Sequence, residues 1–568
     1  MSFQVSPGVQ VKEIDLTNVV PAVSTSIGGY AGAFSWGPVE EIRTIGSEKE
    51  LASVFGVPPK TDAATSISFL IASSFLKYGN SLKVSRAAAA TTYKNATTGH
   101  DASSGLQIKN RDQYESQYSS NANTVGVYGA KYPGTLGNSL FVSVCPAGIA
   151  DFSSWSFSSE FSSKPGTSSF AAAAGSSNDE LHIVVGDATG IWTGTAGTVL
   201  ERFAFVSQAT DAVKEDGTSN YYKTVLNDTS AYVWHLAHDT AAGNLEEAGT
   251  SAYTTGTFTG SNTIDYSFTG GTDTTVTTAH TSTALDMFSD ADTVDVNLLF
   301  AGADVDGDTT IAVKLKALAE ARKDTLVFLS PPIVATVGSA APADDVKAWA
   351  GDIVGSSYAV LDSTALKVYD KYADVYRWIP ACGHMAGLCA NTDQVADAWF
   401  SPAGFSRGQL LGVAKLAHNP KQADRDSLYK ASVNPIVAFP GQGTILFGDK
   451  TALVKPSAFD RINVRRLFIV LEKAISTAAK FQLFEFNDEF TRAMFRNMVE
   501  PFLRDVQGRR GITDFAVVCD TTNNTPQIID ANEFRAEIYI KPAHSINFIT
   551  LSFIATRTGV QFSELVGK

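Results

Sequence analysis

The chain has 568 residues, of which 44 are Lys or Arg and 58 are Asp or Glu, so its formal net charge is −14. Hydrophobic residues make up 44 % of it, which excludes a wholly disordered protein. The length corresponds to about three or four domains. The acidic balance argues against nucleic acid as a direct ligand, because phosphate binding needs clustered Lys and Arg.

The sequence shows no signal for export or for membrane insertion. No apolar run approaches the ~20 residues that span a bilayer, and the N-terminus lacks the basic and then apolar layout of a signal peptide. The four cysteines are too sparse for a disulfide framework. We therefore expect a soluble protein made in a reducing cytoplasm.

Residues 1–20 are predicted to form an extended arm. Val9 and Val11 alternate with Gln10 and Lys12, which is the period of a β-strand, and Ile14 continues in the opposite phase. No hairpin partner follows in the sequence. Such a strand needs an edge to pair with, and another chain can supply that edge.

Residues 21–90 and 295–455 are predicted to form one α/β domain that is split by an insertion. Ser47 and Glu50 form a capping box before a short helix, and helical periodicity marks residues 63–78 and 309–323. An apolar strand follows at 326–330. Alternation of helix and strand is typical of an α/β layer.

Residues 91–294 are predicted to be one or two inserted β-rich domains. Ser, Thr, Gly and Ala dominate this segment, and short apolar stretches such as HIVVG recur in it at strand spacing.

Residues 456–568 are predicted to form an α+β domain. Apolar residues between Val464 and Ala478 lie on one helical face, with Arg466 and Lys473 on the other. Asn487 is expected to cap a second helix. Alternating residues around 515–519, 534–540 and 549–555 predict strands that pack on these helices, and Val560 and Phe562 predict a further terminal strand.

Several segments approach known ligand-binding motifs and fail on spacing. The acidic run from Asp304 to Asp308 has Leu315 where a calcium loop needs a bidentate Glu. Residues 443–451 have Asp449 where a phosphate-binding loop needs Lys. The sequence offers no catalytic constellation, so we expect neither an enzyme nor a cofactor.

A possible metal motif is equally weak. Cys382, His384 and Cys389 match no common zinc spacing and are expected in a glycine-rich turn with incidental thiols. His544 is expected to be a surface or packed imidazole. We therefore expect no metal site.

Taken in order, several segments resemble the contractile tail sheath proteins of tailed phages. They include SPGVQVKEID near the N-terminus, WIPACGHMAGLCANTD at 378–393, INVRRLFIVLEKAI at 462–475 and FNDEFTRAMFRNMVEPFLRDVQGRRGI at 486–512. IYIKPAHSINFITLSFIATRTGV at 538–560 completes the series. None is diagnostic alone, but their order over the whole chain makes the match specific.

The resemblance implies an α+β multidomain fold with three parts. These are an inner domain made from both chain ends, a split middle α/β domain and outer β-rich insertions. It also implies a virion tail subunit, assembled in the host cytoplasm, that forms stacked hexameric rings around a tail tube and contracts to drive the tube through the host envelope. The partners would be other copies, the tail tube protein, and baseplate and tail terminator proteins.

The resemblance also implies the residues that join subunits. The arms would pair with sheets of neighbouring copies through Val9, Gln10, Val11, Lys12, Glu13, Ile14 and Asp15, and through Phe553, Ile554, Ala555, Val560, Gln561 and Phe562. The arm hinges would be Thr17, Asn18, Val19, Thr556, Thr558 and Gly559. A basic cluster expected to face the tail tube comprises Arg492, Arg496, Arg504, Arg509 and Arg510.

Two other interpretations stay open at this point. One is a sheath from a related bacteriocin-like or secretion injection machine. The other is a soluble carbohydrate-binding protein in which Trp155, Trp192 and Trp234 of the insertion stack on sugars.

Overall fold

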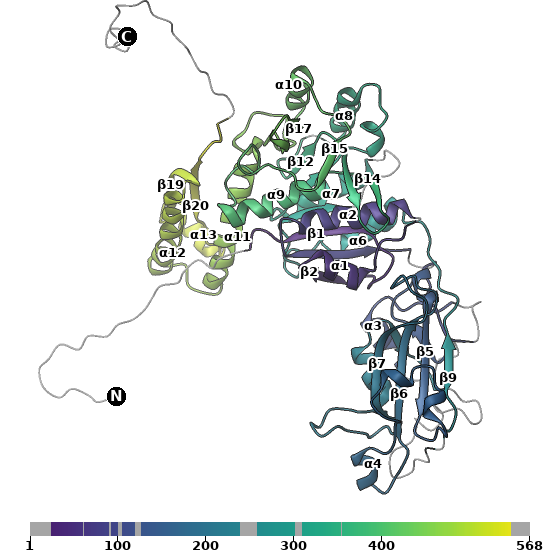
Figure 1. Ribbon diagram of the computed structural model, residues 1–568. Helices are drawn as coiled ribbons and strands as arrows, with labels where there is room; N and C mark the ends of the chain where they lie inside the picture. The colour runs from purple at the N-terminus through teal and green to yellow at the C-terminus, as the bar shows by residue number, and fades with distance from the viewer. Residues whose placement is uncertain are drawn as a thin grey trace, which may run out of the picture. The chain divides into compact units, whose positions relative to one another are not determined.

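The structure, a computed structural model, describes residues 24–60, 62–89, 92–99, 105–119, 126–238, 258, 260–301, 309–353 and 355–546 (Figure 1). The chain divides into two compact units. The larger comprises Ala22–Ala398 and Pro402–Lys473, and the smaller comprises Met1–Pro21, Trp399–Ser401 and Ala474–Lys568.

The larger unit is built on a seven-stranded sheet with the order β16-β12-β11-β10-β1-β3-β2. Neighbouring strands are parallel except β2, which pairs antiparallel with β3. The strand bounds are β1 Gly28–Ala33, β2 Ile42–Ile45, β3 Leu82–Ala87, β10 Leu298–Ala301, β11 Leu326–Leu329, β12 Ala359–Asp362 and β16 Val433–Asn434. Two segments separated by the insertion therefore share one sheet.

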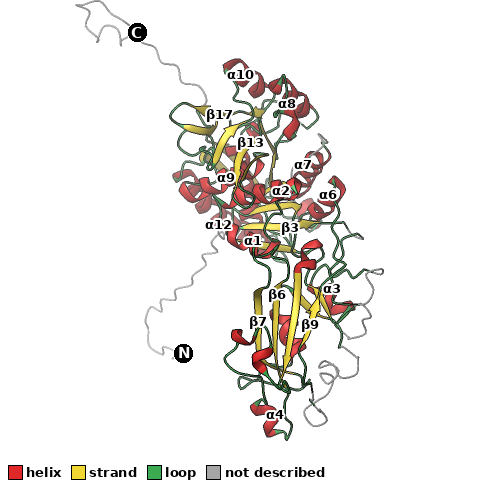
Figure 2. Cartoon of the chain, turned by 45° about the vertical axis from the view of Figure 1, so that its right-hand side comes forward, coloured by secondary structure: helices red, strands yellow, loops and turns green. Residues whose placement is uncertain are grey.

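Both faces of this sheet are covered by helices (Figure 2). Alternate strand residues enter different cores: Leu298 and Phe300 belong to one core, and Leu299 and Ala301 belong to the other. The first core is covered by α1 Glu48–Phe55, α2 Ala63–Leu76 and α9 Cys382–Val395. The second is covered by α6 Thr278–Asp286, α7 Thr310–Arg322, α8 Pro342–Gly351 and α10 Gln422–Lys430.

Small antiparallel sheets complete this part of the larger unit. Strand β13 pairs with both β14 and β15, and β17 pairs with β18. Their bounds are β13 Leu366–Asp370, β14 Val375–Ile379, β15 Val413–Leu416, β17 Ile436–Phe439 and β18 Gly443–Leu446.

The described residues of the insertion form antiparallel sheets. Its four-stranded sheet has the order β7-β6-β5-β9, and β4 pairs with β8. The bounds are β4 Tyr128–Ala130, β5 Leu140–Pro146, β6 Glu180–Asp187, β7 Thr198–Ser207, β8 Val233–His235, β9 Ile264–Ser267, α3 Arg111–Gln117, α4 Ser169–Ala173 and α5 Tyr222–Thr229. Residues 278–294 were expected in this insertion, but α6 packs on the seven-stranded sheet through Leu285.

In the smaller unit, α12 Glu489–Gly508 packs against β19 Ile512–Val518, which pairs antiparallel with β20 Glu537–Pro542. A short helix, α13, spans Pro526–Asp530. Helix α11, Ile462–Ala479, is continuous across the boundary between the units, which lies between Lys473 and Ala474.

The α12 cap differs from its sequence prediction. The N-cap is Asp488, whose carboxylate accepts the Thr491 N–H at 2.8 Å, because Asn487 instead contacts Arg492 and Asn524. The capping box of α1 is also incomplete. Ser47 accepts the Glu50 N–H as predicted, but the Glu50 carboxylate accepts the N–H of Gly46.

Candidate functional site

The segment that approaches a phosphate-binding loop is a structural contact. Asp449 is buried and forms an ion pair with Arg461 at 2.9 Å. The Lys450 ammonium donates to the Tyr429 carbonyl oxygen at 2.8 Å. Both charged side chains are therefore used to hold this part of the larger unit together. The acidic run from Asp304 to Asp308 lies outside the described residues.

Cys382, His384 and Cys389 lie on helix α9 and not in the glycine-rich turn expected for them. His384 is buried with its Nδ1 2.9 Å from the Tyr78 hydroxyl, and burial lowers its pKa to about 3. Burial raises the pKa of each of the two thiols to about 12. A neutral imidazole and protonated thiols form a packed core here. His544 is exposed.

A metal site would need several ligating side chains in one place. Within the described ranges, no group of three or more His, Cys, Asp or Glu side chains could hold a metal ion.

In the same ranges, no helix is both long and apolar enough to cross a bilayer.

The tryptophans considered for sugar stacking pack against other protein side chains. Trp155 and Trp234 are buried, and Trp234 stacks on Tyr114 with ring centroids 4.2 Å apart. Trp192 packs edge-on against Trp36 at 5.0 Å. Protein side chains therefore cover Trp155 and Trp234, whereas Trp192 is only partly buried.

The basic cluster expected on α12 is smaller than the sequence suggests. Arg492 is buried and donates to the Asn487 side chain at 2.7 Å, so it is not a surface cation. Arg504 pairs with Glu500 one turn earlier, and Arg509 pairs with Asp505. Arg496 is partly exposed and Arg510 is exposed. The terminal strands and hinges, residues 9–19 and 553–562, lie outside the described residues.

A buried ion pair holds the first described residues of the larger unit. Both carboxylate oxygens of Asp393 in α9 lie 2.7 Å from the Arg466 guanidinium of α11. Arg466 also donates to the carbonyl oxygens of Cys389 and Thr25. The sequence placed Arg466 on the solvent face of its helix, whereas the structure buries it. It thereby joins α9 and α11 to residue 25, just after the undescribed residues 1–23.

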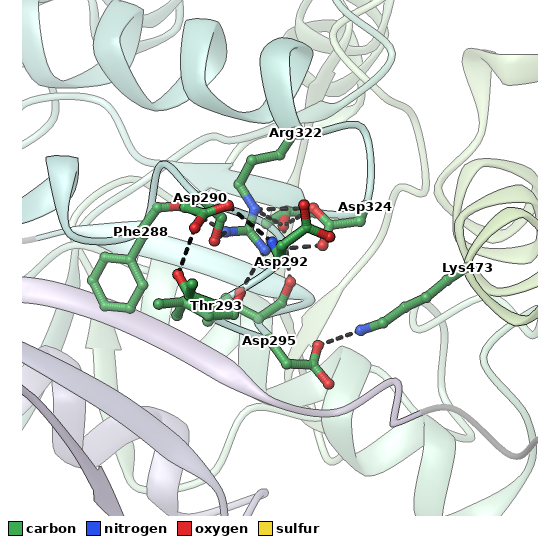
Figure 3. Close-up of polar contacts among 11 residues, drawn as sticks. Phe288, Asp290, Asp292, Thr293, Asp295, Arg322, Asp324 and Lys473 are labelled. Carbon is green, nitrogen blue, oxygen red and sulfur yellow. Dashed lines mark hydrogen bonds and ion pairs between the residues drawn. The ribbon is translucent and has the colours of Figure 1, made fainter. Parts of the chain in front are cut away.

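A second cluster of polar contacts fixes residues 287–297, which connect α6 to β10 (Figure 3). Arg322 donates to the carbonyl oxygens of Phe288, Asp290 and Val294 and forms an ion pair with Asp324 at 2.9 Å. At the edge of the same segment, the Asp295 carboxylate pairs with the Lys473 ammonium of α11. Lys473 is the last residue of the larger unit, so this pair holds α11 where it crosses into the smaller one.

One surface feature was missed from the sequence. We define the aromatic loop as residues 481–490, which follow α11 and include the first two residues of α12. Its large apolar side chains are 63–106 % exposed; they are Phe481, Leu483, Phe484, Phe486 and Phe490. The sequence feature that could have revealed this surface is the apolar run FQLFEF before the cap of α12. Such a run is usually interpreted as part of a hydrophobic core.

Two family models match adjacent parts of the chain. The phage tail sheath protein central domain matches residues 274–452, and the phage tail sheath C-terminal domain matches residues 454–556. The chain is 33 % identical to the tail sheath protein of Vibrio phage KVP40, with 99 % of both chains covered. It is 32 % identical to that of Enterobacteria phage T4, again over 99 % of both.

Solved structures of other sheath proteins share the fold. A sheath tail protein of Listeria innocua has a TM-score of 0.54 at 13 % identity, covering 92 % of this chain and 96 % of that one. The helical sheath of the anti-feeding prophage in its contracted state has a TM-score of 0.50 at 13 % identity, covering 98 % and 100 %. Because relatives above 30 % identity match over almost its entire length, the chain belongs to the phage tail sheath proteins, structural components of the virion and not an enzyme family.

Proposed function

We propose that copies of this chain assemble as stacked hexameric rings around a tail tube and contract to drive that tube through the host envelope. Membership of the tail sheath proteins is the observation that carries the proposal. The contracted helical sheath of the anti-feeding prophage has the same fold, which supports a helical polymer. Contraction would be a cooperative shift between two packings of rigid subunits, driven by the free energy of the assembly.

The arms would join neighbouring subunits through the sheet of the smaller unit. Among the described residues this sheet has only two strands, β19 and β20. A two-stranded sheet is marginal alone and leaves two open edges. Strands from other copies, formed by residues 9–15 and by 553–555 and 560–562, would complete it. The hinges would be residues 17–19, Thr556, Thr558 and Gly559.

Contact with the tail tube is proposed for the cations on α12 and directly after it that remain at the surface. These are Arg496, Arg504, Arg509 and Arg510, without Arg492. Arg504 and Arg509 already form ion pairs with Glu500 and Asp505 of α12, so their contact with the tube would be weak and sensitive to salt. A weak contact suits a tube that must slide free of the sheath. Baseplate and terminator proteins would bind at the two ends of the polymer.

Electron microscopy of the purified full-length protein at increasing concentration tests the proposal. Hollow tubes or stacked rings are the expected result. If the protein stays monomeric alone, tail tubes are added as a template. A protein that fails to polymerise even on tail tubes would contradict the proposed function.

A further inference from the structure

The aromatic loop is an unusual surface for a folded protein. Within its ten residues, the large apolar side chains project into solvent, and Phe484 has a φ of +71°, a conformation that bulky side chains disfavour. Exposed apolar patches of this kind mark binding surfaces. Strained backbone is retained where the surrounding structure and function require it.

The charge of the loop restricts its partner. Residues 481–490 contain the carboxylates Glu485, Asp488 and Glu489, all exposed, and no Lys or Arg. An acidic rim around apolar side chains is complementary to an apolar patch that carries a cation.

A patch of that chemistry lies on the larger unit of the same chain. We define the phenylalanine triad as Phe405, Phe439 and Phe447, whose ring centroids are 5.3–6.1 Å apart. Phe405 and Phe447 are exposed, and the Arg425 guanidinium lies 6.0 Å from the Phe439 ring centroid. The neighbouring carboxylate, Asp424, accepts the Lys421 N–H at 3.2 Å.

We infer that the aromatic loop of one copy docks on the phenylalanine triad of the next copy. Two different patches on one chain make a head-to-tail contact, which generates rings or helical polymers and not closed dimers. The apolar side chains would exclude water at the centre, and Glu485 and Arg425 would pair at the rim. This inference rests on the proposed polymerisation and adds a contact that does not use the terminal arms.

Thiol cross-linking tests the contact directly, since all four native cysteines are buried. A chain that carries both Phe405→Cys and Phe484→Cys is polymerised and treated with a short bismaleimide. We expect a ladder of covalent multimers. A mixture of the two single variants should give dimers only, because each copy then has one reactive end. Three outcomes would each overturn the inference. They are cross-links between two Phe484→Cys sites, cross-links to the tail tube protein, and the absence of a ladder in polymers of normal appearance.

Surface variants give a second, independent test. Phe484→Ser with Phe486→Ser should raise the protein concentration needed for polymerisation about tenfold or more. The matched control is Ile191→Ser with Val334→Ser, which removes two apolar side chains that are also exposed. Equal polymerisation of both double variants would overturn the inference.

Charge reversal tests the proposed ion pair between Glu485 and Arg425. Glu485→Arg and Arg425→Glu should each weaken polymerisation, and the two together should restore it. If wild-type protein polymerises and the combined variant is as weak as the single ones, the pairing at the rim is wrong. If wild-type protein never polymerises, the proposed function fails instead.

Discussion

Lys473 is the last residue of α11 that belongs to the larger unit, and it forms an ion pair with Asp295. Asp295 lies next to Val294, whose carbonyl oxygen accepts a hydrogen bond from buried Arg322 at 2.8 Å (Figure 3). The pair therefore joins α11 to a segment that is already fixed. Lys473 is mostly buried and Asp295 is about half exposed, so solvent partly screens the interaction.

Replacing Lys473 with Met or Asp295 with Asn should remove a coupling energy of about 0.5 kcal/mol, because a half-exposed pair is weak. A double-mutant cycle of urea unfolding measures it, and the coupling should fall at high salt. The swapped variant, with Lys473→Asp and Asp295→Lys, should recover part of it. A coupling that does not change with salt would contradict an electrostatic origin.

Arg466→Met should cost far more, about 3–5 kcal/mol of unfolding free energy, because Asp393 would remain buried without a partner. Arg466→Lys should recover little, since one ammonium nitrogen cannot also replace the second guanidinium nitrogen, which donates to the Cys389 carbonyl oxygen. The control is Arg535→Met, which breaks an exposed pair with Glu533 and should change stability by about 0.5 kcal/mol or less. Urea unfolding measures all three, and equal effects of Arg466→Met and the control would contradict the prediction.

Local periodicity was enough to predict many elements of the larger unit. The apolar run at 326–330 and the helical pattern at 309–323 correspond to β11 and α7. Contacts between distant residues could not be predicted in this way. Arg466 was placed in solvent because its partner, Asp393, lies 73 residues earlier in the chain.

Other features were misread because sequence alone does not show what covers a side chain. Helix α9 was expected to be a turn because Gly383 and Gly387 favour loops, yet tertiary packing keeps it helical. The aromatic loop has the composition of a core segment, and only the structure shows that its side chains are exposed. The sequence named surface arginines as a contact, which stays a prediction, and it did not name the aromatic residues.

Deletion of residues 1–20 should leave a folded, soluble monomer that cannot form tubes. The deleted arm carries the strand proposed to complete the sheet of a neighbouring copy, whereas the two cores of the seven-stranded sheet are built from later residues. Electron microscopy measures tube formation, and circular dichroism confirms that the fold is kept. A truncated protein that still builds long tubes would show that arm exchange is not required.

Stability should depend on pH through two buried groups with opposite effects. Burial raises the pKa of Asp362, which accepts a hydrogen bond from Ser330, to about 7 from 3.8. The folded protein then holds a proton that the unfolded chain releases, so stability falls as pH rises from about 4 to 7. His384 has a pKa lowered to about 3 from 6.5, so its contribution is lost as pH falls through that range.

Variants separate these two contributions. Relative to wild type, Asp362→Asn should gain stability as pH rises from about 4 to 7, by up to about 1.4 kcal/mol for each pH unit. His384→Gln should show the opposite trend, gaining relative stability as pH falls from about 6.5 to 3. Urea unfolding at a series of pH values measures both differences. A difference that is constant with pH would mean that the replaced group does not titrate differently in the folded protein.

Gly383→Ala should destabilise the larger unit because α9 packs closely on α2 at this position. A Cβ atom on Gly383 would lie 2.3 Å from the backbone carbonyl oxygen of Ile71, so one helix must move. Such overpacking typically costs about 1–3 kcal/mol. The matched control is Gly351→Ala at the end of α8, where an added Cβ meets no atom within 4 Å. The control should be neutral or gain up to about 1 kcal/mol from the better helix propensity of Ala. Urea unfolding measures both variants, and similar stabilities would show that α9 and α2 can separate at little cost.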